Sequence, residues 1–161
     1  MSNERPVPSF VIAHPAHLLA LGFGAGLAPR APGTAGTLHA WPLGWWLSGF
    51  PAAIVLPVIV ALFLVGIWAC GLTGRHLGPA DHGAMVWDEI VAFLLILAVV
   101  PRALDWQAAA FVLFRAFDIA KPPPIGEFEA RFKGGFGVMG DDLLAAGYTL
   151  LVLAVLQRAL F

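Results

Sequence analysis

The feature that most constrains the fold is the run from Ala52 to Leu72, which contains no charged side chain. A helix of about 20 predominantly apolar residues is long enough to cross the hydrocarbon core of a bilayer. Charge is also scarce elsewhere: 12% of residues are charged and 60% hydrophobic, against about 25% and 45–50% in soluble domains. Helices with so few charges cannot all present a polar face to water, so the sequence predicts an all-α, multi-helix integral membrane bundle.

The remaining apolar runs are shorter, and segments rich in glycine, proline and charge separate them. The run Ala16–Ala28 is too short to span a bilayer, so it favours a re-entrant or interfacial helix. A short helix from Trp41 is expected to end at the break over residues 48–51. Further helices are predicted over Val86–Val100, Trp106–Ala120 and Leu143–Leu160. We expect one domain over residues 1–161, with a polar tail at residues 1–14.

Helices that alternate in direction place the segments 28–38, 73–86 and 121–141 on one face of the membrane. That face collects most basic side chains, namely Arg5, Arg30, Arg75, Lys121, Arg131 and Lys133. The opposite face has Arg102 and Arg158. Basic residues concentrate in cytoplasmic loops. We therefore expect the first face, with its polar loops, to lie in the cytoplasm.

Two adjacent pairs of acids lie on this predicted face. Asp88 and Glu89 open an apolar helix with no neighbouring base, and Asp141 and Asp142 come at the start of the last helix. Each acid inside a membrane helix costs about 2.5–3.5 kcal/mol, so such groups are usually paired, solvated or functional. A divalent cation would balance the excess negative charge, and Mg²⁺ favours a few carboxylates together with water. The alternative for Asp141 and Asp142 is ordinary capping of a helix start.

Three charged residues end the predicted helix Trp106–Ala120. Arg115 and Asp118 are three positions apart and share a helix face, which Lys121 would also share if the helix continued. These residues would bring one more acid and two bases toward the acidic pairs. The alternative is a purely structural ion pair between Arg115 and Asp118.

Two glycine-rich segments invite comparison with anion-binding sites. The segment "PRAPGTAGT" could form a nest of backbone N–H groups, with Thr34 and Thr37 as hydroxyl donors and Arg30 nearby. The segment "GGFGVMG" formally matches a dinucleotide pattern, but no strand precedes it and two acids follow it, so a flexible loop is the preferred interpretation. The net charge of −1 provides no basic surface for nucleic acid.

Four motifs follow one another along the chain: "APGTAGTL", "VWDEIVAF", "FRAFDIAKPPPI" and "GGFGVMGDDLLAAG". Together they resemble the phosphatidylglycerophosphatase A family of small bacterial membrane enzymes, from about His17 to Leu153. The resemblance implies Mg²⁺-dependent hydrolysis of the phosphomonoester of phosphatidylglycerophosphate at the cytoplasmic face of the inner membrane. It implies that the metal-binding and catalytic acids are Asp88, Glu89, Asp118 and Asp142, with Asp141 next to them. It also matches Arg115 and Lys121 to basic positions of the same motif.

The resulting hypothesis is metal-assisted hydrolysis of a phospholipid within a membrane. The expected Mg²⁺ ligands are Asp88, Glu89, Asp118 and Asp142. The ion would polarise the phosphate and activate water, and Asp141 or Glu89 would take the proton. The phosphate would be held by Thr34, Thr37, Arg30, Arg115 and Lys121, because charge spreads over the phosphoryl oxygens in the transition state.

A second hypothesis is a small ion or proton transporter, since carboxylates within a membrane also mark ion pathways. Transporters usually place such residues near the membrane midplane and often contain inverted repeats. This sequence has no evident internal repeat, and its acids gather at one side, so the phosphatase hypothesis is preferred. The oligomeric state is left open.

Overall fold

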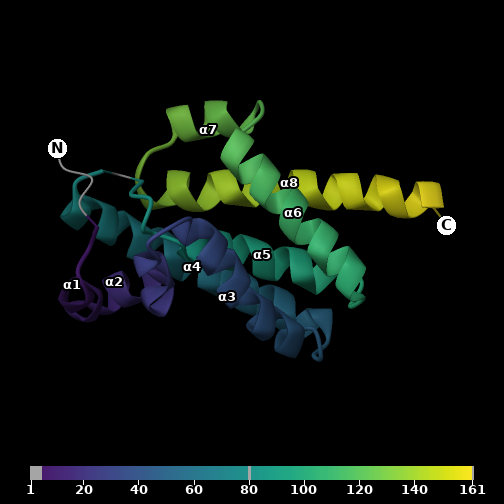
Figure 1. Cartoon of the computed structure of the whole chain (residues 1–161), viewed down its shortest axis with the longest axis horizontal. Helices are drawn as coiled ribbons and strands as arrows, with labels where there is room; N and C mark the ends of the chain where they lie inside the picture. Colours follow the sequence, from purple (N-terminus) through teal and green to yellow (C-terminus); the bar gives the residue numbers. More distant parts are fainter. Residues whose placement is uncertain (1–4, 80, 161) are drawn as a thin grey trace.

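The computed structural model describes residues 5–79 and 81–160, and over this part the chain forms helices and no strand (Figure 1). The helices are α1 (Pro8–Ile12), α2 (Pro15–Ala20), the 3₁₀ helix η1 (Gly22–Leu27), α3 (Pro32–Leu47), α4 (Ala52–Leu77), α5 (Trp87–Val99), α6 (Leu104–Ala120), α7 (Ile125–Arg131) and α8 (Gly134–Leu160). The predicted all-α bundle is confirmed.

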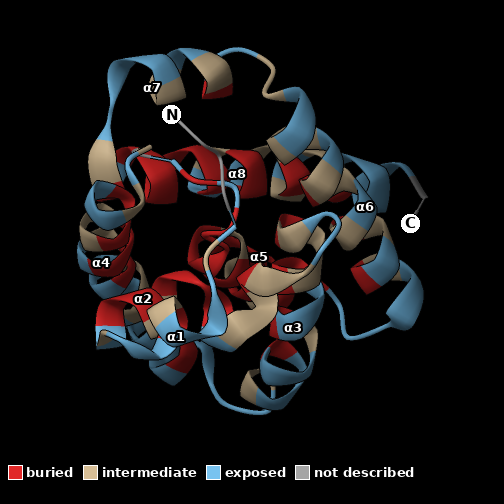
Figure 2. Cartoon of the chain, turned by 60° about the vertical axis from the view of Figure 1, so that its left-hand side comes forward, coloured by how far each residue is buried: buried red, intermediate tan, exposed pale blue. Residues whose placement is uncertain are grey.

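Helix α5 is the central helix of the bundle. It packs against α3, α4 and α8, and Figure 2 shows buried residues on all of its sides. Phe93, Leu94 and Leu97 are almost completely buried, as expected for a helix that is apolar all round. Its 13 residues extend about 20 Å, less than a hydrocarbon core of about 30 Å. Helix α5 is therefore enclosed by other helices and does not need to match the membrane thickness itself.

Helices α4 and α8 have the length and composition to cross a membrane, with mean hydropathies of 2.8 and 1.6 over their most apolar windows. The 26 residues of α4 extend about 39 Å. Large apolar side chains point away from the bundle on both helices: Leu64 is 60% exposed, Leu151 63% and Val155 61%. An apolar surface of this extent fits lipid and not water. The chain is thus a helical membrane protein.

The helix ends divide between two ends of the molecule (Figure 1). Helices α1, α2 and α7, the connection from α4 to α5 and the start of α8 lie at one end, which we call the α7 end. The turns at 48–51 and 100–103 and the last turns of α8 lie at the other. The segments that the sequence grouped on one face therefore lie at the α7 end.

Two helices begin earlier than the sequence predicted. Helix α3 begins at Pro32 instead of near Trp41, and proline is favoured in a first helical turn because its nitrogen has no proton to leave unpaired. Helix α8 begins at Gly134 instead of Leu143. The predicted nest over "PRAPGTAGT" and the predicted flexible loop over "GGFGVMG" are therefore wrong, because most of each segment is helical.

The glycines of these segments lie where helices touch. A Cβ atom at Gly36 of α3 would come within 2.7 Å of the Val86 Cβ, and one at Gly135 of α8 within 1.8 Å of the Ile67 carbonyl oxygen. Glycine in these helices permits a close backbone approach, at a cost of about 1 kcal/mol in intrinsic helix propensity. Packing between helices thus overrides the local signal for a loop.

The N-terminal segment also differs in part from its prediction. The expected polar tail at 1–14 contains the short helix α1, whose Val11 is buried against Leu21 and Ala84. The expected re-entrant helix over Ala16–Ala28 is divided between α2 and η1, neither of which is long enough to span a membrane. Backbone at Phe23 and Gly24 with positive φ separates the turns of η1.

Replacing Gly135 by alanine tests the contact between α4 and α8. The added methyl group would meet the Ile67 carbonyl oxygen, so we expect Gly135→Ala to lower the free energy of unfolding by about 1–3 kcal/mol, as overpacking does. Gly147 of the same helix has open space around it, so Gly147→Ala is the matched control and should be neutral or slightly stabilising. Thermal unfolding in detergent micelles measures both. Equal midpoints for the two variants would contradict the packing role of Gly135.

Candidate active site

The first part of the site is the start of α5, where Asp88 and Glu89 occupy the first turn. The indole Nε1 of Trp87 donates a hydrogen bond to the Leu62 carbonyl oxygen at 3.2 Å, which ties this turn to α4. Asp88 is 8% exposed, and the Glu89 side chain 12%. Acids are favourable at a helix N-terminus because the peptide dipoles leave partial positive charge there. The local position thus lowers the cost of burying two adjacent carboxylates.

Helix α8 brings Asp142 to this pair. One carboxylate oxygen from each of Asp88, Glu89 and Asp142 lies within 4.8 Å of the others. We call these three residues the first acid group. Asp142 is 2% exposed, and α8 has no acid in its first turn, so the alternative of helix capping for Asp141 and Asp142 is wrong. The group depends on the close packing of α4, α5 and α8.

Each member of the first acid group keeps one buried oxygen without a hydrogen-bond partner among the described residues. These atoms are Asp88 Oδ1, Glu89 Oε2 and Asp142 Oδ2. A buried polar atom without a partner costs about 1–3 kcal/mol, and more when it is charged. Hard divalent cations are bound by converging carboxylate oxygens of this kind. The donor set therefore fits a divalent cation.

Arg115 of α6 lies beside the first acid group. Its Nη1 is 3.2 Å from Glu89 Oε1 and 2.6 Å from Asp118 Oδ2. Asp118 thus forms an ion pair with Arg115, which lies one turn before it in α6. It does not belong to the group of three converging carboxylates. The Nε of Arg115 is buried and has no partner among the described residues. Arg115 therefore fixes one oxygen of Glu89 and leaves the other free.

A second acid group comprises Asp81, Glu129 and Asp141, which again offer oxygens within 4.8 Å of one another. Lys121 sits among them, with Nζ 2.6 Å from Asp141 Oδ2 and 3.2 Å from Glu129 Oε1. Burial would lower the pKa of Lys121, but the hydrogen bond and attraction of Asp141, together with those of Glu129, raise it above its ordinary value. Lys121 therefore stays charged and neutralises this group internally.

Sequence reasoning missed Glu129 as a partner of Asp141. Glu129 lies on the short helix α7, inside what the sequence showed only as a long polar segment. The spacing of Phe128 and Phe132, four positions apart in "EFEARF", is a local sign that this segment forms a helix. Phe128 of that helix packs where a Cβ of Gly140 would lie, and this contact places Glu129 near Asp141.

The start of α3 approaches the first acid group through a glycine. A Cβ atom at Gly33 would come within 1.8 Å of Glu89 Oε1, so only glycine fits there. Thr37 was predicted to bind phosphate. It is fully buried, and its hydroxyl instead donates a hydrogen bond to the Gly33 carbonyl oxygen at 2.9 Å. Thr34 is half-buried in the first turn of α3, and Arg30 is exposed just before that helix.

Comparison with known proteins was made on the whole chain. A family model described as phosphatidylglycerophosphatase A matches residues 18–157. A Haemophilus influenzae protein named phosphatidylglycerophosphatase A is 43% identical over 160 residues, which are 98% of each chain. The Escherichia coli protein of that name is 40% identical over 136 residues, 83% of this chain and 78% of its own.

A third relative has a different name. It is a Bacteroides thetaiotaomicron protein, provisionally named a phosphatidylinositol-3-phosphatase, and it is 42% identical over 146 residues, 86% of this chain and 91% of its own. No solved structure matches the chain.

Replacing Arg115 by methionine tests its role between Glu89 and Asp118. Removing one partner of a buried ion pair leaves charge without compensation and costs about 3–5 kcal/mol. We expect Arg115→Met to lower the unfolding midpoint in detergent well below that of wild type. The matched control is Arg102→Met, because Arg102 is exposed at the opposite end of the bundle and contacts Ser48 and Trp45. An equal loss in both variants would contradict the buried role of Arg115.

Proposed function

We propose that this chain, which belongs to the phosphatidylglycerophosphatase A family, hydrolyses the phosphomonoester of phosphatidylglycerophosphate to phosphatidylglycerol and phosphate. The family makes it a lipid phosphatase, and its apolar helices suit a substrate that stays in the membrane. The finer parts of the proposal are the use of Mg²⁺, the division of work among the acids and a site that faces the cytoplasm.

The observation that carries the proposal is the set of three unpartnered, buried oxygens on Asp88, Glu89 and Asp142. Mg²⁺ would be held by Asp88 and Asp142, and Glu89 lies beside these two ligands. When bound, the ion supplies positive charge that polarises the phosphoryl oxygens and promotes attack by water. The remaining steps depend on side chains of this chain.

Proton transfer is assigned to Glu89. Asp141 and Glu89 were the predicted candidate bases, but both oxygens of Asp141 are engaged, Oδ2 by Lys121 and Oδ1 by the backbone N–H of Asp142. Glu89 is fixed through Oε1 by Arg115 and keeps Oε2 free. A positioned carboxylate with one free oxygen is suited to accept a proton from attacking water.

Phosphate binding is assigned to Arg115. Its buried Nε has no partner among the described residues, so it can donate to a phosphoryl oxygen while Nη1 holds Glu89 and Asp118. A guanidinium suits this task because its donors are fixed in a plane and always charged. Lys121 is engaged by Asp141 and Glu129, which makes it a positioning residue for α7 and α8 in this proposal.

The transporter hypothesis has less support. The acids of both groups belong to segments at the α7 end, and no comparable acid cluster occurs near the other end among the described residues. An ion path would need polar groups along its length, whereas the middle of the bundle around α5 is lined by buried apolar side chains.

Removing a metal-binding acid tests the proposed reaction. We expect Asp88→Asn and Asp142→Asn each to lower kcat for phosphate release from phosphatidylglycerophosphate in micelles by about a hundredfold or more, because loss of the ion removes several kcal/mol of transition-state stabilisation. Chelation of Mg²⁺ by EDTA should lower the kcat of the wild type by a similar factor. Asp105→Asn is the matched control, since Asp105 is exposed in the first turn of α6, and its turnover should equal that of wild type.

Thermal unfolding gives a second readout for the metal. A ligand that binds only the folded state raises its stability, so Mg²⁺ should raise the unfolding midpoint of wild type and of Asp105→Asn. It should not raise the midpoint of Asp142→Asn. Full turnover in EDTA, or the same Mg²⁺-induced shift in all three proteins, would contradict the metal site.

Labelling of single cysteines tests the proposed orientation in the membrane. In a Cys70→Ala background, a membrane-impermeant maleimide should reach cysteines placed at Arg30 or Glu127 only from the cytoplasmic side. Glu127 is exposed on α7, and Arg30 is exposed just before the start of α3, where Gly33 meets Glu89. Cysteines at Gly49 or Arg102, exposed at the opposite end, should react only from the periplasmic side. The reverse pattern in inside-out and right-side-out vesicles would contradict a cytoplasmic site.

A further inference from the structure

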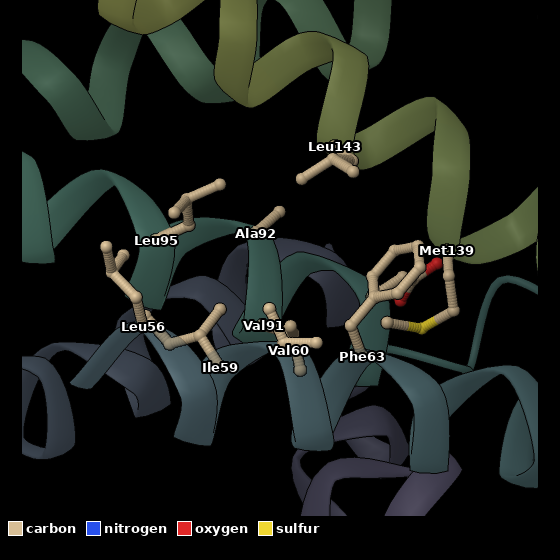
Figure 3. Close-up of a pocket in the computed structure, with 10 residues that line it drawn as sticks. Leu56, Ile59, Val60, Phe63, Val91, Ala92, Leu95, Met139 and Leu143 are labelled. Atoms are coloured by element: carbon tan, nitrogen blue, oxygen red, sulfur yellow. The ribbon is translucent and has the colours of Figure 1, made fainter. Parts of the chain in front are cut away.

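An apolar cavity of about 310 Å³ lies between α4, α5 and α8 (Figure 3). Nine of the residues that line it are apolar and one is an acid, Asp88. The apolar residues are Leu56, Ile59, Val60, Phe63, Val91, Ala92, Leu95, Met139 and Leu143.

The cavity has a buried floor and an exposed rim. Its floor is α5, where Val91 and Ala92 are 2% and 3% exposed. Its rim consists of side chains on the two flanking helices, with Val60 of α4 57% exposed and Leu143 of α8 39% exposed. The cavity is therefore a groove that opens sideways between α4 and α8, toward the region that lipid occupies in a membrane.

The shape of the groove follows from the packing of α4 and α8. The two helices touch closely toward the α7 end, where Gly135 faces the Ile67 carbonyl oxygen and Gly66 faces the Met139 side chain. Beyond Met139 there is space between them, and Figure 3 shows Leu56 and Leu95 at the far end of that space from Phe63 and Met139. From Phe63 to Leu56 the groove follows α4 over two turns, about 10 Å.

Asp88 joins the groove to the first acid group. It lines the groove, and it also belongs to the three converging carboxylates. A molecule that lay along the groove would therefore have one end beside Asp88 and the rest in contact with hydrocarbon side chains. An amphipathic ligand with an anionic head and a hydrocarbon tail has this distribution of polarity.

We propose that the groove between α4, α5 and α8 holds one acyl chain of the phospholipid substrate and so directs its phosphate to the first acid group. This inference rests on the proposed function, and it adds the part of the substrate that is recognised within the membrane. The continuity of the groove with Asp88 distinguishes it from the mostly apolar cavity beside Leu38 and Trp87, whose lining residues include no acid.

The proposed effect of the groove is to position the substrate headgroup more than to raise the affinity for the substrate. An acyl chain leaves a lipid environment as apolar as the groove, so no hydrophobic driving force favours its entry. Holding the chain fixes where the headgroup lies, and a displacement of about 1 Å at the reacting atoms can lower a rate about a hundredfold. Filling the groove should therefore lower kcat more than it raises KM.

The test fills the groove at its floor. Ala92→Phe places a ring where the chain would lie, and Ala108→Phe on the exposed side of α6 is the matched control. We expect Ala92→Phe to lower kcat/KM about tenfold or more for dipalmitoyl phosphatidylglycerophosphate, and to change it less than about twofold for the dibutanoyl compound, whose chains are too short to follow the groove. An equal loss on both substrates, or a loss on neither, would overturn the proposal.

Photochemical labelling gives an independent measurement on the unmodified protein. Phosphatidylglycerophosphate with a diazirine in its palmitoyl chain should label Val60, Ala92 or Leu143 severalfold more than Trp45 or Val112, which are 54% and 64% exposed on other helices. Equal labelling at all these positions would overturn the groove as a binding site, even if the enzyme releases phosphate. Labelling of the groove without phosphate release would instead support the groove as an acyl-chain site and contradict the proposed reaction.

Discussion

The burial of carboxylates in a bundle with few charges is the constraint on which the rest of the structure depends. Isolated ionised groups away from water are very costly, so each acid at the α7 end needs a cation, a hydrogen bond or a ligand. Arg115 and Lys121 satisfy part of this need. Three oxygens of Asp88, Glu89 and Asp142 have no hydrogen-bond partner within residues 5–79 and 81–160, and these unpaired carboxylate oxygens make the first acid group a candidate site.

Close approach of helix backbones brings these acids together. Asp88 and Glu89 come from α5 and Asp142 from α8, so their distance depends on how tightly both helices pack with α4. Glycines at the contacts make that packing possible, with Gly66 against Met139 and Gly33 against the Glu89 carboxylate. Each glycine costs some intrinsic helix stability. Packing along the whole helix offsets this cost and sets the geometry of the acids.

The sequence predicted the parts of this structure that depend on composition and local pattern. Predominantly apolar runs indicated the helices α4, α5 and α6, and the lack of a neighbouring base marked Asp88 and Glu89 as unusual. The starts of α3 and α8 could not be predicted in the same way. Their glycines are local signals for a loop, and only the facing surfaces of α4 and α5, which are distant in sequence, make them packing positions.

The pairing of acids with bases was also beyond the sequence. Lys121 was expected to bind phosphate together with Arg115, but its partners are Asp141 and Glu129, which follow it in the chain. Such partners depend on where α7 lies, and α7 carries only a weak local pattern. Asp118 likewise proved to pair with Arg115 and to lie outside the three converging carboxylates.

The two acid groups show that neighbouring cations decide what a buried carboxylate can do. Asp141 and Asp142 are adjacent in sequence and almost equally buried, yet they belong to different groups because successive residues of a helix point about 100° apart. Asp141 meets Lys121 and is neutralised there. Asp142 meets two other acids and keeps an oxygen for which the described part of the chain offers no hydrogen-bond partner. In the proposed site, a motif of two acids therefore supplies one structural carboxylate and one metal ligand, because the helix rotation between them gives the two side chains different neighbours.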